Sequence, residues 1–337
     1  MKYTLKKLTE MKIMIKTVFL DGQGLGNQLW VYAAGHAISK HTGRAHVISN
    51  LDKFKGKSFL TLEHELDPQP DLEVMEFNER LFYDPEIEYF SSTYDSRVEN
   101  LPCRAALFGL FQSEKYFYGQ EDKLKEWIKV SEHVSSLENQ YKDVLVLNIR
   151  GGEYKRHKKL LLPKKYWEEA ILRMKDLNGN QEILIVTDDK EYANSIFPKY
   201  EVLKGGIAEC YSALRGAGSI VVSNSSFSYF PIKTREVQPT VIAPEHWARF
   251  GSAKEKWAMP SNLYKDWKWM THTGNLKSYD ECIEDAELLA SFYEREYSLS
   301  VPLSMGIGLP WTRHIPLDLK KPVKFFLSKA FPRKFGR

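Results

Sequence analysis

The chain has 337 residues, which is enough for two domains of ordinary size. Hydrophobic residues make up 43% of it and charged residues 27%, the composition of a soluble globular protein. No run of about 18 apolar residues occurs, so the sequence predicts no membrane-spanning helix.

Positive charge is concentrated at the C-terminus. The net charge is +4, and residues 319–337 hold seven basic residues and no acidic one. Subtracting these seven leaves the rest of the chain at −3, which argues against a nucleic-acid-binding surface spread over the fold. Phenylalanine, valine and leucine interleave with the basic residues of this tail, so it predicts peripheral contact with anionic lipid; a flexible, solvated terminus is the alternative.

The cysteines and the N-terminus indicate the compartment. Cys103, Cys210 and Cys282 are far apart and form no C-x-x-C pair, so we expect neither a zinc site nor a disulfide framework. Residues 1–16 lack the apolar core and the cleavage site of a secretory signal. We therefore expect a cytoplasmic protein, held peripherally at the inner face of the membrane through its tail.

Strands and helices are expected to alternate along two stretches of the chain. In the first stretch the expected elements are a strand at 13–20, a glycine-rich elbow at 21–28, a helix at 27–41 that stops at Gly43, a strand at 46–48, loops and short elements at 50–100, an apolar segment at 105–118 and a helix at 120–130. In the second they are strands at 144–149, 183–186, 202–203, 219–222 and 241–242, with helices at 164–177, after 189 through 196, at 208–215 and after the polar loop 223–228.

This alternation predicts parallel sheets covered by helices on both faces. The fold class is therefore α/β, with two facing Rossmann-like domains and a cleft between them. The boundary is expected within 131–142. This division gives an acceptor-side domain (1–135), a donor-binding domain (136–270) and a C-terminal extension (271–337) that is helical and ends in the basic tail.

The first motif is the glycine-rich elbow, with Gly22, Gly24 and Gly26 directly after the first strand. Glycines let a backbone approach a diphosphate closely, and the N-terminus of the following helix favours negative charge. Asn27 stands where the third glycine of the dinucleotide pattern G-x-G-x-x-G would be. A phosphate-binding loop and a tight strand-to-helix turn both remain open.

The second motif, NIRGGEY, covers residues 148–154 at the end of a predicted strand. Ligands in open α/β sheets bind at such carboxyl ends. Arg150 offers a planar fork of donors suited to phosphate, and Glu153 is placed to accept a proton. The alternative is an arginine–glutamate pair that fixes the loop.

Two further motifs also follow strands. Successive side chains of an extended segment point in opposite directions, so Asp188 and Asp189 are poorly placed to hold one metal ion. After Thr187, one carboxylate is expected to bind a guanine edge or ribose hydroxyls and the other to cap the next helix; capping alone is the alternative. Residues 223–228 (SNSSFS) offer hydroxyl and N–H groups to an anion, or simply cap a helix.

Taken in order, these segments resemble the bacterial and animal α-1,2-fucosyltransferase family. The similar segments, which lie between about residues 13 and 270, are GLGNQLWVYAAG (24–35), LFGLFQSEKYF (107–117), NIRGGEY (148–154), VTDD (186–189), SNSSFSYF (223–230) and IAPEHW (242–247). The resemblance implies a GT-B architecture, GDP-fucose as the donor, inversion at the sugar carbon, and neither a divalent metal nor another cofactor. The family usually reads His-x-Arg-x-Gly-Asp-Tyr where this chain has Asn148 and Glu153, which leaves open a related GDP-deoxyhexose as donor.

The same resemblance implies that Arg150 holds the donor diphosphate, Asp189 the guanosine, and Ser225 or Ser226 a phosphate. Arg150 and Glu153 are the predicted catalytic residues, with Glu153 nominated as the base by its position. The other residues expected to contact the donor or line the cleft are Gly24, Gly26, Asn27, Gln28, Asn148, Thr187, Asp188, Ser223, Asn224 and Phe227.

The sequence therefore predicts an enzyme that moves L-fucose from GDP-fucose to a hydroxyl of a glycan, such as O2 of galactose, during synthesis of a bacterial surface polysaccharide (O-antigen or capsule). The acceptor is an oligosaccharide or a lipid-linked glycan, and no nucleic acid is involved. The alternatives are a transferase for another GDP-deoxyhexose, an NAD-dependent oxidoreductase, and a non-catalytic nucleotide-sugar-binding protein.

Overall fold

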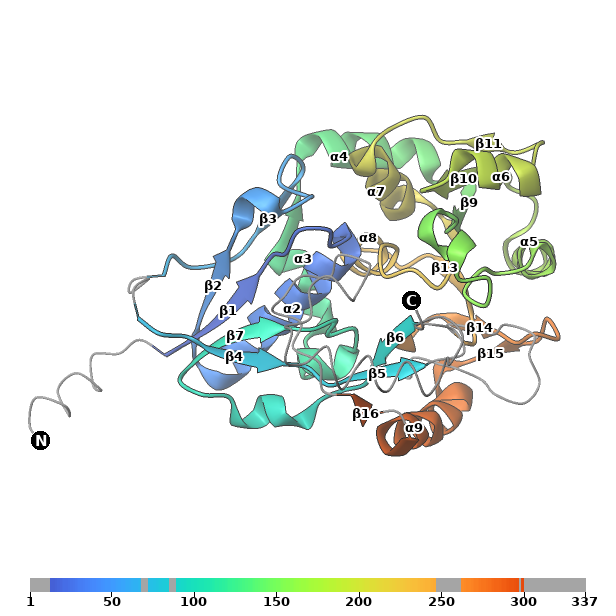
Figure 1. Ribbon diagram of the computed structural model, residues 1–337. Coiled ribbons are helices and arrows are strands. Elements are labelled where there is room, and N and C mark those ends of the chain that lie inside the picture. The colour runs from blue at the N-terminus through green and yellow to red at the C-terminus, as the bar shows by residue number, and fades with distance from the viewer. Residues whose placement is uncertain (1–12, 68–71, 85–88, 247–261, 297, 300–337) are drawn as a thin grey trace, which may run out of the picture.

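The computed structural model describes residues 13–67, 72–84, 89–246, 262–296 and 298–299. Two sheets, one in each half of the chain, form its framework; the first is parallel and the second is parallel except for its last strand (Figure 1). The predicted α/β class, with two Rossmann-like units, is confirmed.

The first sheet has the strand order β2-β1-β7-β4, and all its strands are parallel. The strands are β1 (Met14–Val18), β2 (Ala45–Ser49), β4 (Met75–Asn78) and β7 (Arg104–Phe108). Helix α2 (Leu25–Thr42) connects β1 to β2, as predicted, and most of its residues are buried. It ends at Gly43, whose φ of 66° is readily adopted only by a residue without a Cβ.

Residues 50–100 contribute more regular structure than the sequence predicts. Strand β4 extends the first sheet, but Met75 on it is exposed, so its four residues carry little apolar pattern. The other elements of the first half are the strands β3 (Leu60–Leu62), β5 (Leu81–Asp84), β6 (Tyr89–Ser92) and β8 (Ile128–Val130), and the 3-10 helices η1 (Leu51–Lys53), η2 (Ser96–Asn100), η3 (Glu114–Phe117) and η4 (Glu121–Lys123). Strand β5 pairs with β6 and with β16 (Ser298–Leu299).

The helix predicted over 120–130 is wrong in its length. The helical part consists of η4 and α3 (Leu124–Trp127), and the chain then becomes strand β8, which pairs antiparallel with β3. Ile128 and Val130 are β-branched, and their pairing with β3 outweighs continuation of the helix.

The second sheet has the order β11-β10-β9-β12-β13-β14-β15, with only β15 antiparallel. Strand β13, predicted as the last strand, is followed by two more, so this prediction is wrong. The strands are β9 (Val144–Ile149), β10 (Glu182–Thr187), β11 (Glu201–Val202), β12 (Ser219–Val222), β13 (Thr240–Pro244), β14 (Lys268–Met270) and β15 (Leu276–Lys277). The connecting elements are η6 (Gly152–Arg156), α5 (Lys164–Asn178), α6 (Lys190–Ile196), α7 (Ile207–Gly216) and α8 (Tyr229–Lys233).

The two units share one hydrophobic core. Trp30 of α2 packs its ring 4.3 Å from that of Tyr229 in α8 and 5.8 Å from that of Tyr264, both in the second half. The segment 131–142 between the sheets folds as α4 (Glu132–Glu138) and η5 (Asn139–Tyr141). Ser212 of α7 donates a hydrogen bond to the carbonyl of Val134 in α4 (2.8 Å), which ties this connection to the second unit.

The predicted C-terminal extension (271–337) contains β15, which belongs to the second sheet, followed by α9 (Tyr279–Glu296). The basic tail at 319–337 lies outside the described residues. Within the described part of the chain, no helix is both long and apolar enough to cross a membrane.

Candidate active site at the facing strand ends

Each parallel sheet has a point where the chain reverses its direction across the sheet. In the first sheet this switch lies between the neighbours β1 and β7, and in the second between β9 and β12. Ligands in open α/β sheets bind outside the carboxyl ends of the strands at such a point. Of the segments that leave these four strands, the sequence picked out the elbow 21–28, the loop 150–154 and the loop 223–228 as sites; the turn 109–112 after β7 is the fourth.

The two switch points meet at Asn27. Its side-chain oxygen accepts hydrogen bonds from Gln112 Nε2 (2.9 Å) in the first unit and from Ser226 Oγ (2.7 Å) in the second. Gln112 Oε1 in turn accepts from Asn262 Nδ2 (3.3 Å). At this junction the units are in contact, and we call Asn27, Gln112, Ser226 and Asn262 the junction cluster.

Gly26 makes this contact possible. A Cβ at Gly26 would lie 2.5 Å from the carbonyl carbon of Ser226 and 2.6 Å from the nitrogen of Phe227. Gly24, by contrast, is exposed, and a Cβ there would meet nothing within 4 Å. Gly26 is therefore needed so that the backbone of the second unit can approach, whereas Gly24 is not.

The prediction that Gln28 contacts the donor or lines the cleft is wrong. Gln28 is fully buried, its Nε2 donates to the carbonyl of Lys53 (2.9 Å), and its Oε1 accepts from the N–H of Lys55 (2.9 Å). Because both ends of the amide hold the loop after β2, Gln28 supports the interior of the first unit.

Arg150 is held by two carboxylates. Its Nη1 lies 2.7 Å from Asp188 Oδ2 and its Nη2 lies 3.1 Å from Glu153 Oε1. Burial opposes the charge of Arg150, but Asp188, Tyr154 and Glu153 outweigh it and raise its pKa, so the guanidinium is a permanent cation. The loop-fixing pair that the sequence left open is therefore formed, while Arg150 stays 31% exposed and Glu153 43%.

The neighbouring aspartates have different partners. Asp188 Oδ1 accepts from the N–H of Gly151 (2.9 Å), whereas Asp189 caps α6 by accepting from the N–H of Tyr192 (3.0 Å). Asp189 also forms an ion pair with Lys155, which lowers its pKa. Thr187 Oγ1 accepts from the N–H of Asp189 (3.0 Å) and so supports the same turn. The predicted cap is confirmed at Asp189; its contact with guanosine stays a prediction.

Two buried polar atoms at the second switch point have no hydrogen-bond partner among the described residues. They are Oδ1 of Asn148, which lies two residues before Arg150 in the NIRGGEY motif, and Oγ of Ser223. The two residues are adjacent, since the N–H of Ser223 donates to the carbonyl of Asn148 (3.1 Å). A buried polar atom without a partner costs roughly 1–3 kcal/mol, so this pair marks a place where a polar ligand would stabilise the protein.

The rest of the serine loop is held by its own contacts. Asn224 Nδ2 donates to the carbonyl of Leu160 (2.9 Å), and the carbonyl of Asn224 accepts from Tyr154 OH (3.0 Å), which joins this loop to the NIRGGEY loop. Ser225 Oγ accepts weakly from the N–H of Phe227 (3.4 Å). The helix that the loop opens, α8, has only five residues.

Sequence reasoning missed two members of the junction cluster. Gln112 lies in the segment LFGLFQSEKYF that carried the resemblance, but nothing in its local pattern distinguishes it from a surface amide. Asn262 follows no strand or glycine motif at all. Among the described residues, no three His, Cys, Asp or Glu side chains are grouped so that they could hold a metal ion.

Comparison with known proteins finds relatives of one enzyme class, although no family model matches the chain. The O-antigen biosynthesis glycosyltransferase WbnK of Escherichia coli is 28% identical over 208 residues, which are 53% of this chain and 66% of that protein, just under two thirds. An alpha-1,2-colitosyltransferase of Escherichia coli is 24% identical over 281 residues, which are 69% of this chain and 95% of that protein.

Among solved structures, the fucosyltransferase NodZ from Bradyrhizobium aligns with 69% of this chain and 96% of its own, at 12% identity and a TM-score of 0.44. POFUT1 in complex with GDP aligns with 68% of this chain and 97% of its own, at 12% identity and a TM-score of 0.42. Both curated relatives are glycosyltransferases by name, which bears out the enzyme class predicted from the sequence motifs: the chain is similar to glycosyltransferases over 53% and 69% of its length.

Proposed function

We propose that the chain transfers fucose, or a closely related deoxyhexose, from its GDP-sugar to a hydroxyl of a glycan acceptor. The transfer inverts the sugar carbon and uses no metal ion. The names of the two relatives, one an O-antigen enzyme and one a colitosyltransferase, support a bacterial surface polysaccharide as the setting and extend the donor candidates to GDP-colitose.

One observation carries the proposal: a permanent cation and two buried polar atoms that have no partner within the described part of the chain all belong to the carboxyl ends of the neighbouring strands β9 and β12. Arg150 follows β9, and Asn148 Oδ1 and Ser223 Oγ flank the ends of β9 and β12. A guanidinium binds diphosphate oxygens in a bidentate way, and the Ser223 hydroxyl can donate a further hydrogen bond to them. Asn148 Oδ1 only accepts hydrogen bonds, so it suits a hydroxyl or N–H group of the sugar nucleotide. This set of groups supports diphosphate binding.

The proposed chemistry follows from where charge develops. As the bond between sugar and phosphate breaks, negative charge builds on the leaving diphosphate, and preorganised donors there are worth roughly 3 kcal/mol each. When Arg150 turns to the diphosphate, it gives up its contact with Glu153. The Glu153 carboxylate is then available to accept the proton of the acceptor hydroxyl as the transition state forms.

A panel of GDP-sugars tests the proposal directly. The protein is incubated with GDP-fucose, GDP-colitose and GDP-mannose, and released GDP is measured with and without glycan acceptors. We expect release from the deoxyhexose donors and an increase with the matching acceptor. Release from none of them, or a melting temperature raised by NAD and not by GDP, would reject the proposal.

The requirement for a metal is tested in the same assay. We expect the rate of GDP release to be unchanged by a strong chelator, because Arg150 and the neighbouring hydroxyl and N–H groups carry the charge of the diphosphate. Loss of activity with the chelator, restored by Mg²⁺ or Mn²⁺, would contradict the metal-free reaction.

A further inference from the structure

A buried carboxylate lies beside the first switch point and has no place in the chemistry above. Glu79 directly follows β4, which is the neighbour of β7 in the first sheet, and its side chain is only 1% exposed. The turn after β7 closes over it: a Cβ at Gly109 would lie 2.6 Å from Glu79 Oε2. A carboxylate in such a place is costly unless it is fully hydrogen-bonded.

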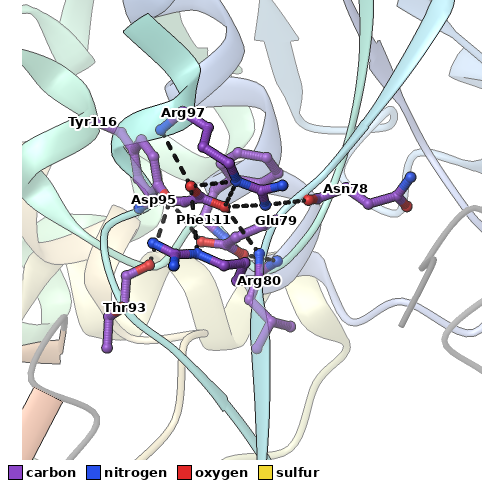
Figure 2. A network of polar contacts seen from close by, with 9 residues as sticks. Asn78, Glu79, Arg80, Thr93, Asp95, Arg97, Phe111 and Tyr116 are labelled. Carbon is purple, nitrogen blue, oxygen red and sulfur yellow. Dashed lines mark hydrogen bonds and ion pairs between the residues drawn. The ribbon is translucent and has the colours of Figure 1, made fainter. Parts of the chain in front are cut away.

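Glu79 is bonded on both oxygens (Figure 2). Its Oε2 accepts from the N–H groups of Leu110 (2.7 Å) and Phe111 (2.8 Å), and its Oε1 accepts from the hydroxyl of Tyr116 (2.8 Å). Three donors and near-complete burial exclude Glu79 as a base that touches an acceptor. The carboxylate instead organises the turn.

The turn needs this support because of Phe111. Its φ of 49° lies in the left-handed region, which costs an aromatic residue roughly 1–2 kcal/mol. Hydrogen bonds to a charged acceptor are about twice as strong as neutral ones, so the two N–H bonds to Glu79 offset that strain. Phe111 is fully buried in the core, so the turn is anchored on both sides.

The next residue along the turn is Gln112, which donates to the same Asn27 oxygen that Ser226 binds. We propose that Glu79 is a positioning residue for the transfer reaction: by holding the turn 109–112 it places Gln112, and through it Asn27, at the meeting point of the two units. This inference rests on the proposed function, since it assigns a role in that reaction.

The ionisation of Glu79 gives the proposal a signature. Burial is the main cause that raises the pKa of Glu79 to about 7, and the nearby charge of Asp95 acts in the same direction. The hydrogen bonds from Phe111, Tyr116 and Leu110 lower the pKa but do not outweigh burial. Arg97 and Arg80 also face this region, but both lie within ion-pair distance of Asp95. Protonation weakens the charge-assisted bonds to the turn, so turnover is expected to fall as the pH drops below 7.

The test compares Glu79→Ala and Glu79→Gln with Asp95→Asn, a matched control. Asp95 is a buried carboxylate of the same network, but it bonds to the N–H of Arg80 and to Arg97 and makes no bond to the turn. For each variant we measure the melting temperature, the dissociation constant of GDP, and the kcat of GDP release at pH 5.5 to 8.5.

We expect Glu79→Ala to lower kcat at least tenfold while the dissociation constant of GDP changes less than twofold. Glu79→Gln is expected to recover most of the rate, because its amide oxygen accepts both N–H groups, and to lose the inflection near pH 7. Asp95→Asn is expected to melt at lower temperature with kcat within twofold of the wild type.

Three outcomes would overturn the proposal: Glu79→Ala folded with unchanged kcat, Asp95→Asn losing as much rate as Glu79→Ala, or a pH profile that is identical in the wild type and Glu79→Gln. The last comparison remains decisive if Glu79→Ala does not fold. A wild type that releases GDP from no donor instead refutes the proposed function. In that case the amide-proton shifts of Leu110 and Phe111, expected to titrate near pH 7 only in the wild type, still report whether Glu79 holds the turn.

Discussion

At the scale of single residues, the charged side chains of the candidate site form ion pairs with one another. Arg150 is bound by Asp188 and Glu153, and Lys155 is bound by Asp189. These pairs are partly exposed, so each contributes little to stability and can exchange partners at small cost. A diphosphate, with its higher charge, would compete for Arg150 with the two carboxylates that hold it.

The first prediction concerns Arg150. Arg150→Ala is expected to lower the rate of GDP release at least about 100-fold, because the charge on the leaving diphosphate loses its main donor. The melting temperature should change little. Arg173→Ala serves as the control, since Arg173 makes comparable contacts on α5, to Glu169 and to the carbonyl of Gly274. Near-normal turnover in Arg150→Ala would remove the proposed mechanism.

The second prediction concerns Glu153. Glu153→Gln keeps the size of the side chain and a contact to Arg150 but cannot accept a proton. If Glu153 is the base, kcat with acceptor falls by on the order of 100-fold while acceptor-independent GDP release is maintained. An unchanged rate with acceptor would dismiss this assignment and favour a displacement that needs no strong base.

At the scale of elements, the site depends on how closely two loops approach. The first turn of α2 and the loop before α8 touch through Gly26 and Ser226, and one face of α2 packs against α8 through Trp30 and Tyr229. Close-packed contacts of this kind tolerate no added atom without movement of the backbone. The geometry between the two units is therefore set by small residues as much as by the large aromatic ones.

Gly26→Ala and Gly24→Ala test this point as a pair. A methyl group at Gly26 would lie 2.5 Å from the Ser226 backbone, whereas one at Gly24 meets nothing and Gly24 has an ordinary φ of −71°. We expect Gly26→Ala to lower the free energy of unfolding by about 1–3 kcal/mol and Gly24→Ala to leave it nearly unchanged. Equal effects, measured by urea denaturation, would contradict the close approach.

At the scale of the whole molecule, stability depends on buried ionisable groups inside the first unit. His36 and His46 are both buried, with their Nδ1 atoms 3.1 Å apart, and His46 Nε2 lies 3.0 Å from Thr17 Oγ1. Burial lowers the pKa of His36 to about 4 and that of His46 well below its usual value. Both histidines are therefore neutral in the folded protein at neutral pH.

The histidines predict a loss of stability in acid. Their folded-state pKa values are depressed, so the unfolded chain binds more protons below about pH 6.5, and stability falls as the pH drops from there to about 4. His36→Gln is expected to lose less stability than the wild type between pH 7 and 5. Glu79 has a raised pKa, which makes stability change with pH in the opposite direction, but it is present in both the wild type and His36→Gln. The difference between the two proteins in how stability changes with pH therefore reports on the histidine. His133→Gln, at an exposed position, should behave as the wild type.

The basic tail at residues 319–337 gives a prediction about membrane binding. Residues 319–337 combine seven positive charges with apolar side chains, a pattern typical of an interfacial anchor. We expect the full chain to float with vesicles that contain anionic lipid, and a chain ending at residue 318 to remain in the lower fraction. Equal recovery of both proteins would reject anchoring.

The sequence by itself determined those features that depend on local pattern. The βαβ opening, strand β9 and the alternation of the second half follow from apolar periodicity. The motif glycines, arginine and serines lie near the ends of these strands, where the sequence placed them. The sequence did not predict the strands that have a weak apolar pattern. Strand β4 is short and has an exposed residue, and β14 and β15 follow β13, the last strand that was predicted.

Only the tertiary structure decided which groups meet. The hydrogen bonds that Gln112 and Ser226 donate to Asn27 join residues 85 and 199 positions apart, and no local pattern encodes such pairs. The same holds for Glu79, which the sequence offers as one acidic residue among many and which becomes distinctive only when β4 lies beside β7 and the turn 109–112 closes over it. Strand order, set by burial of both sheet faces, is the physical reason these residues come together.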